Sequence, residues 1–395
     1  MNGWQEVPLG SLLTRIKDDV LIQDFEKYQR LTIRTNNKGI EIRDELEGHL
    51  IGTKNQYVVH GGQFLLSKID AMNGAFGIVP EHVENGIITS NFWAYDVDED
   101  KLFSKYFNYL THTSSFQEFC IQASSGTTHR KYLREDLFLG MEIPLPPLTE
   151  QRRIVEDIES LARRVNEAQS LREEADLEAT VLLDTAVGKV FTELEAREVK
   201  PLKDLATKIG SGSTPKGGRA IYLQSGIPFI RSMNVRMRQF QWSDIAYIDP
   251  DIHESMSGTK VKPRDVLLNI TGASIGRVAC APDDLVEANV NQHVTIIRPI
   301  ETLDYRFLMY WLSQPAIQDF INDEQKGATR QGFTKAQIEQ FEIPILPLDE
   351  QRRIVAYLDG LQAKVNALRE LQSRSGEELS ALMASVLDRA FRGEL

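Results

Sequence analysis

The chain has 395 residues, of which 42% are hydrophobic and 26% charged, and its formal net charge at pH 7 is −12. A chain of this size and composition can build two or more domains with separate cores, so we expect a soluble globular protein. No apolar run approaches the roughly 20 residues of a membrane helix and no leader pattern precedes Gly10, which predicts a cytoplasmic location. Cys120 and Cys280 stand alone, so neither a disulfide framework nor a zinc site is indicated.

The negative charge is unevenly distributed along the chain. Counting Lys and Arg against Asp and Glu gives −5 for residues 1–141, −6 for 142–200, +1 for 201–341 and −2 for 342–395. Phosphate binding relies on Lys and Arg, so the total argues at first sight against a nucleic-acid partner. Local basic clusters remain compatible with this distribution.

The first region, residues 1–141, mixes short β-rich runs with turn signals. Gly61-Gly62 and Asn73-Gly74 punctuate these runs as hairpin turns do. Aromatic and apolar residues then recur at helical spacing over Leu102 to Cys120. We therefore expect a mixed α+β domain.

A segment at residues 142–191 recurs at 342–391 without a gap, and both copies contain EIP, then PL and EQRRIV. Pro144, Pro146 and Pro147 forbid a helix interior, and Thr149 is a plausible N-cap, as is Asp349 in the second copy. The two segments, 142–200 and 342–395, are expected to be a proline-rich lead-in followed by a long helix. Roughly 40 residues of helix give a rod near 60 Å, which suits a spacer.

Both helices carry an apolar heptad seam. It comprises Ile154, Ile158, Leu161, Val165 and Ala168 in the first copy, and Ile354, Leu358, Leu361, Val365 and Leu368 in the second. It falters at Arg172 and Gln372, and resumes with Ala179, Leu182 and Ala186, or Leu379, Leu382 and Val386. Two interpretations stay open. Either the helices pack antiparallel and Arg172 and Gln372 form one polar layer, or Leu171 and Leu371 take over the seam in a stammer.

The second region, residues 201–341, repeats the first in diverged form. PLKDL at Pro201 to Leu205 echoes PLGSL at Pro8 to Leu12, and Phe320, Gly327 and Thr329 match residues of the first region at an offset of 201. The sequence thus predicts a tandem repeat of domain plus helix. Two related domains held at a fixed distance suggest two related reading modules.

Catalytic signatures are missing from the sequence. GSGSTPKGG at Gly210 to Gly218 lacks the Gly-Lys-Ser/Thr of a phosphate loop, so we expect no nucleotide site there. NPPY-like, GxGxxG and HExxH motifs do not occur. We predict no catalytic residue and no metal site, and therefore a protein that is not an enzyme by itself.

Signals of binding are clearer. Arg231, Ser232, Asn234, Arg236 and Arg238 form a basic and polar run, and Arg and Asn are side chains that contact guanine and adenine edges. The run is equally typical of a solvated strand edge. Thr271 to Arg277, TGASIGR, offers glycines that allow close approach to a phosphate, or forms an ordinary tight turn.

The first region has a comparable set of basic and hydroxyl residues, and loops 124–132 and 326–335 occupy equivalent places before the helices. Such loops suit phosphate positioning, although a helix-entry turn would look similar. The predicted DNA-binding residues are Arg34, Lys38, Lys54, Lys68, Asn73, Thr127, Thr128, Arg130 and Lys131 in the first region, and Ser211, Thr214, Arg231, Asn234, Arg236, Thr271, Ser274, Arg277, Thr329, Arg330 and Lys335 in the second.

The doubled segment EIPLPPLTEQRRIV and EIPILPLDEQRRIV, the GxT loops before it and the order domain-helix-domain-helix resemble the specificity subunit of prokaryotic type I restriction-modification systems. The resemblance implies an α+β fold with two target recognition domains, at residues 1–141 and 201–341. Two long helices packed as an antiparallel coiled coil would separate them in a pseudo-two-fold tandem repeat. Each domain would read one half of a bipartite double-stranded DNA site.

The resemblance also implies partners. The helices would set the unread spacer and dock two modification subunits, which methylate adenine with S-adenosylmethionine. Restriction subunits would join for translocation and cleavage that require ATP and Mg, while the specificity subunit has no cofactor of its own. Two alternatives stay open: a specificity factor of a methylation-only or phage-defence system without a nuclease, and a coiled-coil adaptor that does not bind DNA.

Overall fold

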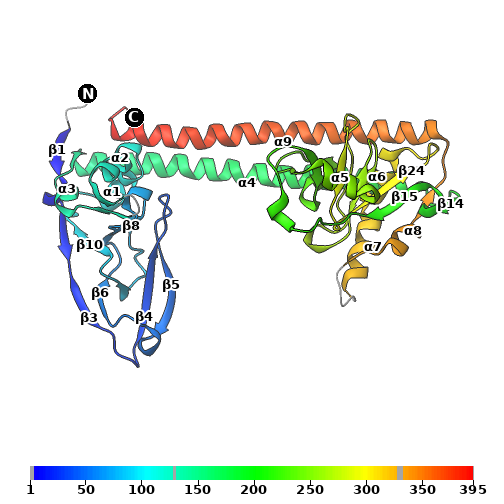
Figure 1. Ribbon diagram of the computed structural model, residues 1–395. Coiled ribbons are helices and arrows are strands. Elements are labelled where there is room, and N and C mark those ends of the chain that lie inside the picture. The colour runs from blue at the N-terminus through cyan, green and yellow to red at the C-terminus, as the bar shows by residue number, and fades with distance from the viewer. Residues whose placement is uncertain (1–3, 128–129, 327–331, 395) are drawn as a thin grey trace. The chain divides into compact units, whose positions relative to one another are not determined.

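The computed structural model describes residues 4–127, 130–326 and 332–394 (Figure 1). The chain forms two compact units: unit 1 contains Met1–Leu171 and Ser373–Leu395, and unit 2 contains Arg172–Gln372. Each unit therefore holds one α+β domain, one part of the long helix α4 (Leu148–Thr192) and one part of the long helix α9 (Leu348–Phe391). Among the helices of the described ranges, none combines the length and the apolar character that a membrane crossing requires.

The domain of unit 1 contains two sheets. A five-stranded sheet has the order β3-β6-β9-β4-β5, in which β4 and β9 are parallel and the other neighbours antiparallel, and it extends as a lobe away from α1 and α2 (Figure 1). A four-stranded sheet has the order β2-β10-β7-β8. The strands are β2 (Leu13–Ile16), β3 (Asp18–Leu21), β4 (Lys27–Ile33), β5 (Ile40–Glu47), β6 (Asn55–Val59), β7 (Phe64–Ser67), β8 (Phe76–Ile78), β9 (Gly86–Ile88) and β10 (Phe92–Val97). Three helices and two strand pairs complete the domain: α1 (Ser104–Thr111), α2 (Ser114–Gln122), α3 (Glu135–Leu139), β11 (Ser124–Thr127) with β12 (Arg130–Leu133), and β1 (Gln5–Pro8) with β13 (Glu142–Leu145).

The domain of unit 2 repeats this plan. Its sheets have the orders β15-β24-β21-β22 and β19-β16-β23-β20, with β16 and β23 parallel as β4 and β9 are. The four-stranded β19-β16-β23-β20 sheet has no counterpart of β3 among the described residues. The elements are β14 (Val199–Pro201), β15 (Ala206–Ser211), β16 (Ile227–Ile230), β17 (Val235–Arg236), β18 (Gln239–Phe240), β19 (Ala246–Ile248), α5 (Pro250–Ser255), β20 (Lys260–Val261), β21 (Val266–Asn269), β22 (Val278–Cys280), β23 (Ala288–Val290), β24 (Val294–Pro299), α6 (Tyr305–Ser313), α7 (Pro315–Lys326), α8 (Lys335–Glu339) and β25 (Glu342–Pro344). The predicted α+β fold and tandem repeat are confirmed.

Aromatic side chains fill the core of unit 1. Phe64, Phe76, Phe107 and Phe116 are fully buried or nearly so, and the Phe391 ring of α9 lies 5.0 Å from that of Tyr106. The helical pattern predicted over Leu102 to Cys120 is formed by two helices, α1 and α2. The break has a local cause, because the Thr113 hydroxyl caps α2 by accepting from the amide of Phe116.

The long helices begin one residue before the predicted caps, so Thr149 and Asp349 lie inside the first turn and are not N-caps. In each helix the carbonyl of the preceding proline accepts hydrogen bonds from two backbone amides of the first turn. Pro147 O accepts from the amides of residues 150 and 151 at 2.8 and 3.0 Å, and Pro347 O accepts from those of residues 350 and 351 at 2.9 and 3.1 Å.

Within each unit the parts of α4 and α9 run antiparallel. In unit 2, Arg369 of α9 donates from Nε to Asp176 Oδ1 and from Nη2 to Thr180 Oγ1 of α4, both at 2.7 Å. The buried face of α4 there consists of Ala179, Leu183, Val187 and Phe191, each four residues after the last. The predicted seam positions Leu182 and Leu382 are wrong, since these side chains are 71% and 45% exposed.

The interruption of the seam coincides with the boundary between the units, which falls after Leu171 and after Gln372. Leu171 and Leu371 are 58% and 63% exposed, so they do not take over the seam and the stammer interpretation is wrong. Arg172 and Gln372 are half-buried, and their contact in one polar layer stays a prediction.

Candidate nucleic-acid interface

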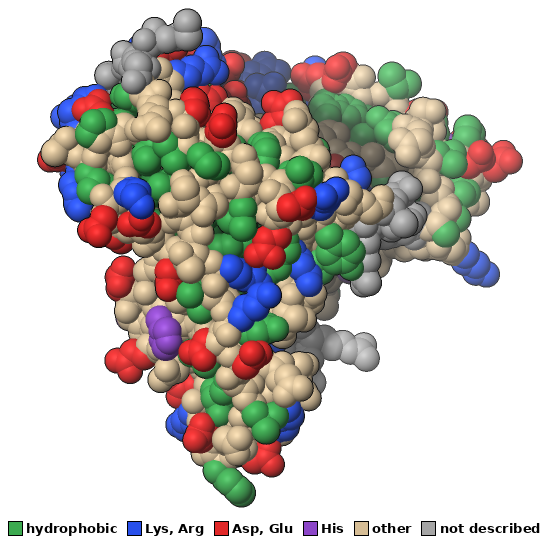
Figure 2. Space-filling model, turned by 90° about the vertical axis from the view of Figure 1, so that its left-hand side faces the viewer, with side chains coloured by type: hydrophobic (Ala, Val, Ile, Leu, Met, Phe, Trp, Pro, Cys, Tyr) green, Lys and Arg blue, Asp and Glu red, His purple; other side chains and the backbone are tan. Residues whose placement is uncertain are grey.

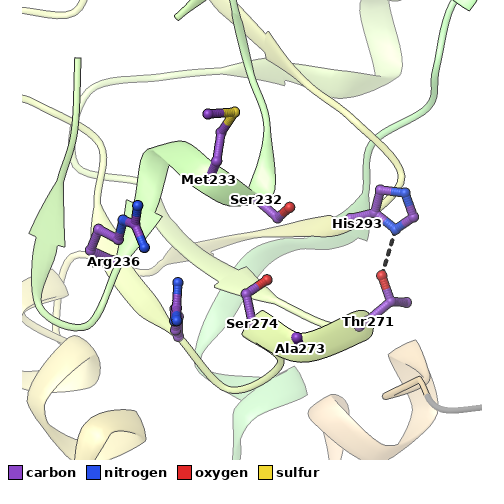
Figure 3. A pocket seen from close by; sticks show the side chains of 9 residues that line it. Ser232, Met233, Arg236, Thr271, Ala273, Ser274 and His293 are labelled. Carbon is purple, nitrogen blue, oxygen red and sulfur yellow. Dashed lines mark hydrogen bonds between the residues drawn. The ribbon is translucent and has the colours of Figure 1, made fainter. Parts of the chain in front are cut away.

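A cleft of about 490 Å³ opens in the domain of unit 2 (Figure 3). Three segments form it: the 3-10 helix Ser232–Asn234 with β17, the 3-10 helix Gly272–Ser274 with the turn that follows it, and the loop before β24. Its lining residues are Ser232, Met233, Arg236, Thr271, Gly272, Ala273, Ser274, Arg277 and His293. Four residues predicted from sequence are therefore brought together here: Arg236, Thr271, Ser274 and Arg277.

Buried Asn269 at the end of β21 holds two of these segments in place. Its Nδ2 donates to Ser232 O at 2.9 Å and to Val235 O at 3.3 Å, and its amide donates to Arg277 O at 2.8 Å. Gly272 and Gly276 have φ of 72° and 82°, which side chains rarely adopt. TGASIGR is thus a constrained turn and also one wall of the cleft, so its two interpretations do not exclude each other.

A chain of hydrogen bonds brings Thr214 to the same place. The Thr214 hydroxyl donates to Gln292 Oε1, Gln292 Nε2 lies 3.0 Å from His293 Nε2, and His293 Nδ1 bonds the hydroxyl of Thr271 (Figure 3). On the opposite wall, Arg236 Nε donates to Gln241 Oε1 at 2.9 Å. The side chain of Arg277 makes no hydrogen bond to the described residues.

The structure corrects the prediction for Asn234. Its side chain is fully buried, because Oδ1 accepts from the amide of Arg231 at 3.0 Å and Nδ2 donates to Gln241 O and Ser243 O at 3.1 and 3.2 Å. An amide engaged in this way holds the loop and does not reach DNA. The guanidinium of Arg231 is engaged within the domain as well, by Asp244 O and by the ring of Tyr222 at 5.6 Å.

Of the remaining predicted residues of unit 2 that the structure describes, Ser211 and Lys335 do not line the cleft. Ser211 is exposed on β15, and Lys335 pairs with Glu339 on α8 at 3.4 Å. Thr329 and Arg330 lie outside the described residues. The loop that carries them ends beside the cleft, since the amide of Phe333 donates to Ile270 O at 2.8 Å.

An equivalent surface exists in unit 1, formed by the turn between β4 and β5, the 3-10 helix Ala71–Asn73 and the hairpin β11–β12. The amides of Asn36 and Asn37 donate to Asn73 O and Gly74 O at 2.7 and 3.0 Å. The amide of Leu133 donates to Lys68 O at 2.8 Å, as that of Phe333 does to Ile270 O in unit 2. Predicted residues Lys38, Lys68, Asn73 and Lys131 are brought to this surface.

The hairpin β11–β12 contains two other predicted residues in its backbone, Thr127 and Arg130, which pair with each other in the ladder. Thr128 lies outside the described residues. Lys54 lies away from this surface, at the opposite end of hairpin β4–β5 from the turn that carries Lys38. Its ammonium donates to Asp24 Oδ1 at 2.6 Å and to Gly48 O at 2.7 Å, which lowers the pKa of the Asp24 carboxyl below its usual value.

The basic residues of unit 1 are largely neutralised by neighbouring carboxylates. Arg34 is paired with Glu41, and Arg30 Nε and Nη2 donate to Asp44 at 2.6 and 2.7 Å, which lowers the pKa of Asp44 to about 2. Acidic and basic side chains lie interspersed over the visible face of unit 1 (Figure 2). Lys38 and Lys68 form no ion pair with the described residues, so this unit offers them as isolated cations.

Sequence reasoning missed Met233, Gln241, Gln292 and His293. The available signal was NQH at Asn291 to His293, directly before a β-rich run. It also missed the role of Gln151 and Gln351 in the repeated motif, which are 0% and 2% exposed at the junction of domain and helix.

Comparisons with known proteins agree with the repeat. The family described as "Type I restriction modification DNA specificity domain" matches residues 1–178 and 195–374. The chain is 24% identical over 382 residues to the specificity subunit of the type I restriction enzyme EcoBI of Escherichia coli, covering 90% of this chain and 79% of that one. It is 20% identical to the MjaVIII specificity subunit of Methanocaldococcus jannaschii, covering 96% and 94%.

Solved structures are similar over the full length. One, described as "Structural basis underlying complex assembly and conformational transition of the type I R-M system", is 25% identical with a TM-score of 0.74 and covers 100% of this chain and 99% of its own. The HsdS subunit from Thermoanaerobacter tengcongensis is 24% identical with a TM-score of 0.57, covering 100% and 98%. Because the family matches both copies of the repeat and most of the sequence, the chain belongs to the type I restriction-modification DNA specificity family.

Proposed function

We propose that this chain is the non-catalytic subunit that gives a type I restriction-modification complex its DNA specificity, and that the domain of each unit reads one half of a bipartite duplex site. The observation that carries the proposal is the recurrence of one surface. In both units the turn after β7 or β21 is joined to the loop before α3 or α8 by the same backbone bond, from Leu133 to Lys68 or from Phe333 to Ile270. A repeated surface on a member of a DNA specificity family suits two half-sites.

The side chains on these surfaces suit the two tasks of DNA recognition. Arg236 and Arg277 offer guanidinium groups for base edges, and Thr271 and Ser274 offer hydroxyls that serve bases or phosphates. Lys38, Lys68, Asn73 and Lys131 in unit 1, and the two loops that contain Thr128 in unit 1 and Thr329 and Arg330 in unit 2, are proposed to contact mainly the phosphate backbone. Such contacts fix the register and carry no sequence information of their own.

The helices are proposed to dock two modification subunits, which supply S-adenosylmethionine chemistry. Restriction subunits that use ATP and Mg complete the complex, and the assembly works in the cytoplasm. Support comes from apolar side chains that α4 and α9 leave in solvent in unit 2, such as Leu182 at 71% and Tyr357 at 55% exposure. Partners with cationic surfaces would compensate the net charge of −12 when DNA binds.

Genome-wide detection of methylated bases tests the proposal. A host expressing this chain with its modification subunit is expected to carry one methylated motif with two specified halves and an unspecified spacer. A host that expresses the modification subunit alone provides the control. A methylated motif that is continuous, or the same methylation without this chain, would contradict the proposal.

A binding measurement complements the methylation map. The chain alone should bind duplex DNA weakly at physiological salt, because its net charge is −12. The complex with the modification subunit should bind its motif tightly. Tight and sequence-specific binding by the isolated chain would count against a role for the partner in phosphate binding.

The spacer role has its own test. Four residues inserted after Gln169 lengthen α4 by about 6 Å, which is nearly two base-pair steps at roughly 3.4 Å each. A matched insertion after Arg369 lengthens α9 by the same amount. If the complex with both insertions methylates the two half-sites at unchanged separation, the helices do not set the spacer.

A further inference from the structure

We propose that the cleft of unit 2 reads a guanine in its half-site, with Arg236 as a bidentate donor and Thr271 as a second donor. The inference rests on the proposed function and names the base that one of the two surfaces recognises. Three features of the cleft support the inference. The guanidinium of Arg236 is held in place by a hydrogen bond, a chain of hydrogen bonds leaves the Thr271 hydroxyl as a donor, and the lining presents donors and apolar groups.

Arg236 is oriented before any ligand arrives. Its Nε donates to Gln241 Oε1 at 2.9 Å, while its Nη groups make no hydrogen bond to the described residues. Gln241 is itself held in place, since its Nε2 donates to Ser243 Oγ at 2.5 Å and its backbone amide donates to Asn234 O at 2.8 Å. A guanidinium fixed through Nε loses little freedom on binding and presents its Nη groups to a ligand with two adjacent acceptors.

The chain of hydrogen bonds ending at Thr271 has a direction. Gln292 Oε1 accepts from Thr214, which assigns the Nε2 group of Gln292 as the donor to His293 Nε2. The hydrogen of the imidazole is then on Nδ1 and is donated to Thr271 Oγ1. A hydroxyl that already accepts a hydrogen bond keeps its own hydrogen for another partner, so Thr271 acts as a donor toward the cleft.

The lining matches the major-groove edge of guanine. Among the described residues it contains two guanidinium groups, three hydroxyls and the imidazole of His293, and no carboxylate or amide side chain. Guanine presents two acceptors, N7 and O6, whereas adenine and cytosine present amino hydrogens that would face donors. Thymine presents the single acceptor O4, which leaves half of the arginine fork without a partner.

A backbone phosphate also consists of acceptors, and the walls of the cleft favour the base over it. Met233, 40% exposed, and Ala273 lie among the donors (Figure 3). Apolar side chains gain by covering the flat apolar surface of a base and gain nothing beside an anionic phosphate, which is best solvated by water and donors on all sides.

The experiment uses the complex of the full chain with its modification subunit. Methylated motifs are mapped for the wild type, Arg236→Ala, Arg236→Gln and the control Lys262→Ala, which removes an exposed charge before β21, at the end of that strand opposite the cleft. The half-site of unit 2 is identified by replacing residues 201–341 with the corresponding domain of another family member. Both Arg236 variants are expected to lose about tenfold or more of the preference for guanine at one position of that half-site. The other half-site and the control stay unchanged.

An atomic substitution in the DNA separates base from phosphate contact. A duplex with 7-deazaguanine at that position lacks N7, and should bind the wild-type complex several-fold more weakly and the Arg236→Ala complex equally well. A half-site without a G·C pair, an unchanged motif, or a uniform loss of affinity without a change in motif overturns the inference. If Arg236→Ala fails to assemble, the 7-deazaguanine duplex still decides with the wild type, since unchanged affinity overturns the inference. A wild-type complex that methylates no bipartite motif contradicts the proposed function instead.

Discussion

In both units one buried glutamine joins the domain to a long helix through the same three hydrogen bonds, whereas the two surfaces proposed to read DNA share a backbone plan and few side chains. Gln151 Oε1 accepts from the amide of Phe103 at 2.7 Å, and its Nε2 donates to Lys101 O and Pro146 O at 2.8 Å. Gln351 repeats this with Asp304 at 2.8 Å, and with Thr302 O and Leu346 O at 2.9 Å.

The difference between junction and surface follows from what each must satisfy. The junction brings backbone groups together at fixed positions, and a glutamine is the side chain that can accept from one amide and donate to two carbonyls there. An ion pair beside it occurs in both units with both residue types changed, Lys105 to Glu159 at 2.9 Å and Arg306 to Asp359 at 2.8 Å. If the two surfaces read different half-sites, as proposed, each must match a different ligand, which accounts for the divergence of their side chains.

The largest effect is expected from the glutamine. Gln151→Leu leaves one amide and two carbonyls without partners, at about 1 to 3 kcal/mol for each buried group, so unit 1 should lose about 3 kcal/mol or more. Hydrogen exchange of the α1 amides measures the loss within that unit. Gln169→Leu, an exposed position on the same helix, should change little, and Gln351→Leu should reproduce the loss in α6 of unit 2. Equal protection in Gln151→Leu and Gln169→Leu would mean that the junction does not depend on this side chain.

The next largest effect is expected from the buried face of the helix pair, in comparison with an exposed position beside it. Leu358 is 0% exposed and Leu182 is 71% exposed. Leu358→Ala should destabilise unit 2 by about 3 kcal/mol through lost burial and a cavity, while Leu182→Ala should cost less than about 0.5 kcal/mol. Hydrogen exchange of the α6 amides again provides the readout. A comparable loss of stability from Leu182→Ala would instead support the heptad seam predicted from the sequence.

The third effect is expected from an ion pair that joins the β17–β18 hairpin to α4. Arg238, between β17 and β18, has a side chain that is 5% exposed and donates to Asp184 of α4 at 2.6 Å. Asp184→Asn removes the charge that compensates a buried guanidinium, and should cost about 2 kcal/mol after allowance for the partly exposed aspartate. Arg238→Met should cost less than Asp184→Asn, because an apolar side chain needs no counter-charge. Thermal unfolding of the two variants side by side checks this order, and the reverse order would exclude a desolvation origin.

The helices and the repeated domains can be predicted from the sequence, whereas the buried face of the helices and the fate of single polar residues cannot, for physical reasons. Periodicity and the gapless repeat predict two long helices and two related domains, because an amphipathic helix repeats a simple pattern. The same periodicity misplaces Leu182, since heptad and four-residue spacings differ by one position and only the partner helix decides between them. Asn234 and Arg236 look alike in sequence as polar residues of one run. Asn234 is buried and Arg236 lines the cleft. The difference depends on which loop carbonyls need a donor, and those of residues 241 and 243 come beside Asn234 only in the folded chain.

The smallest expected effect concerns the ends of the two long helices, which meet the first turn of α2 or α7 at equivalent positions with different chemistry. In unit 1, Asp388 accepts a hydrogen bond from the Ser114 hydroxyl at 2.9 Å. A carboxylate beside the N-terminal turn of α2 is worth about 0.3 to 1 kcal/mol, so Asp388→Ala should destabilise unit 1 by that amount, and more at low salt than at high salt. In unit 2 the equivalent residue is Gly188, and a methyl group there would meet the Pro315 ring at 3.5 Å, an ordinary contact. Gly188→Ala should therefore stabilise unit 2 by up to about 1 kcal/mol through helix propensity. Thermal unfolding at two salt concentrations measures both changes. If the two substitutions shift stability in the same direction, the two helix-end contacts behave more alike than their side chains indicate. The backbone of Gly188, and not its contact with Pro315, would then decide the effect of the substitution.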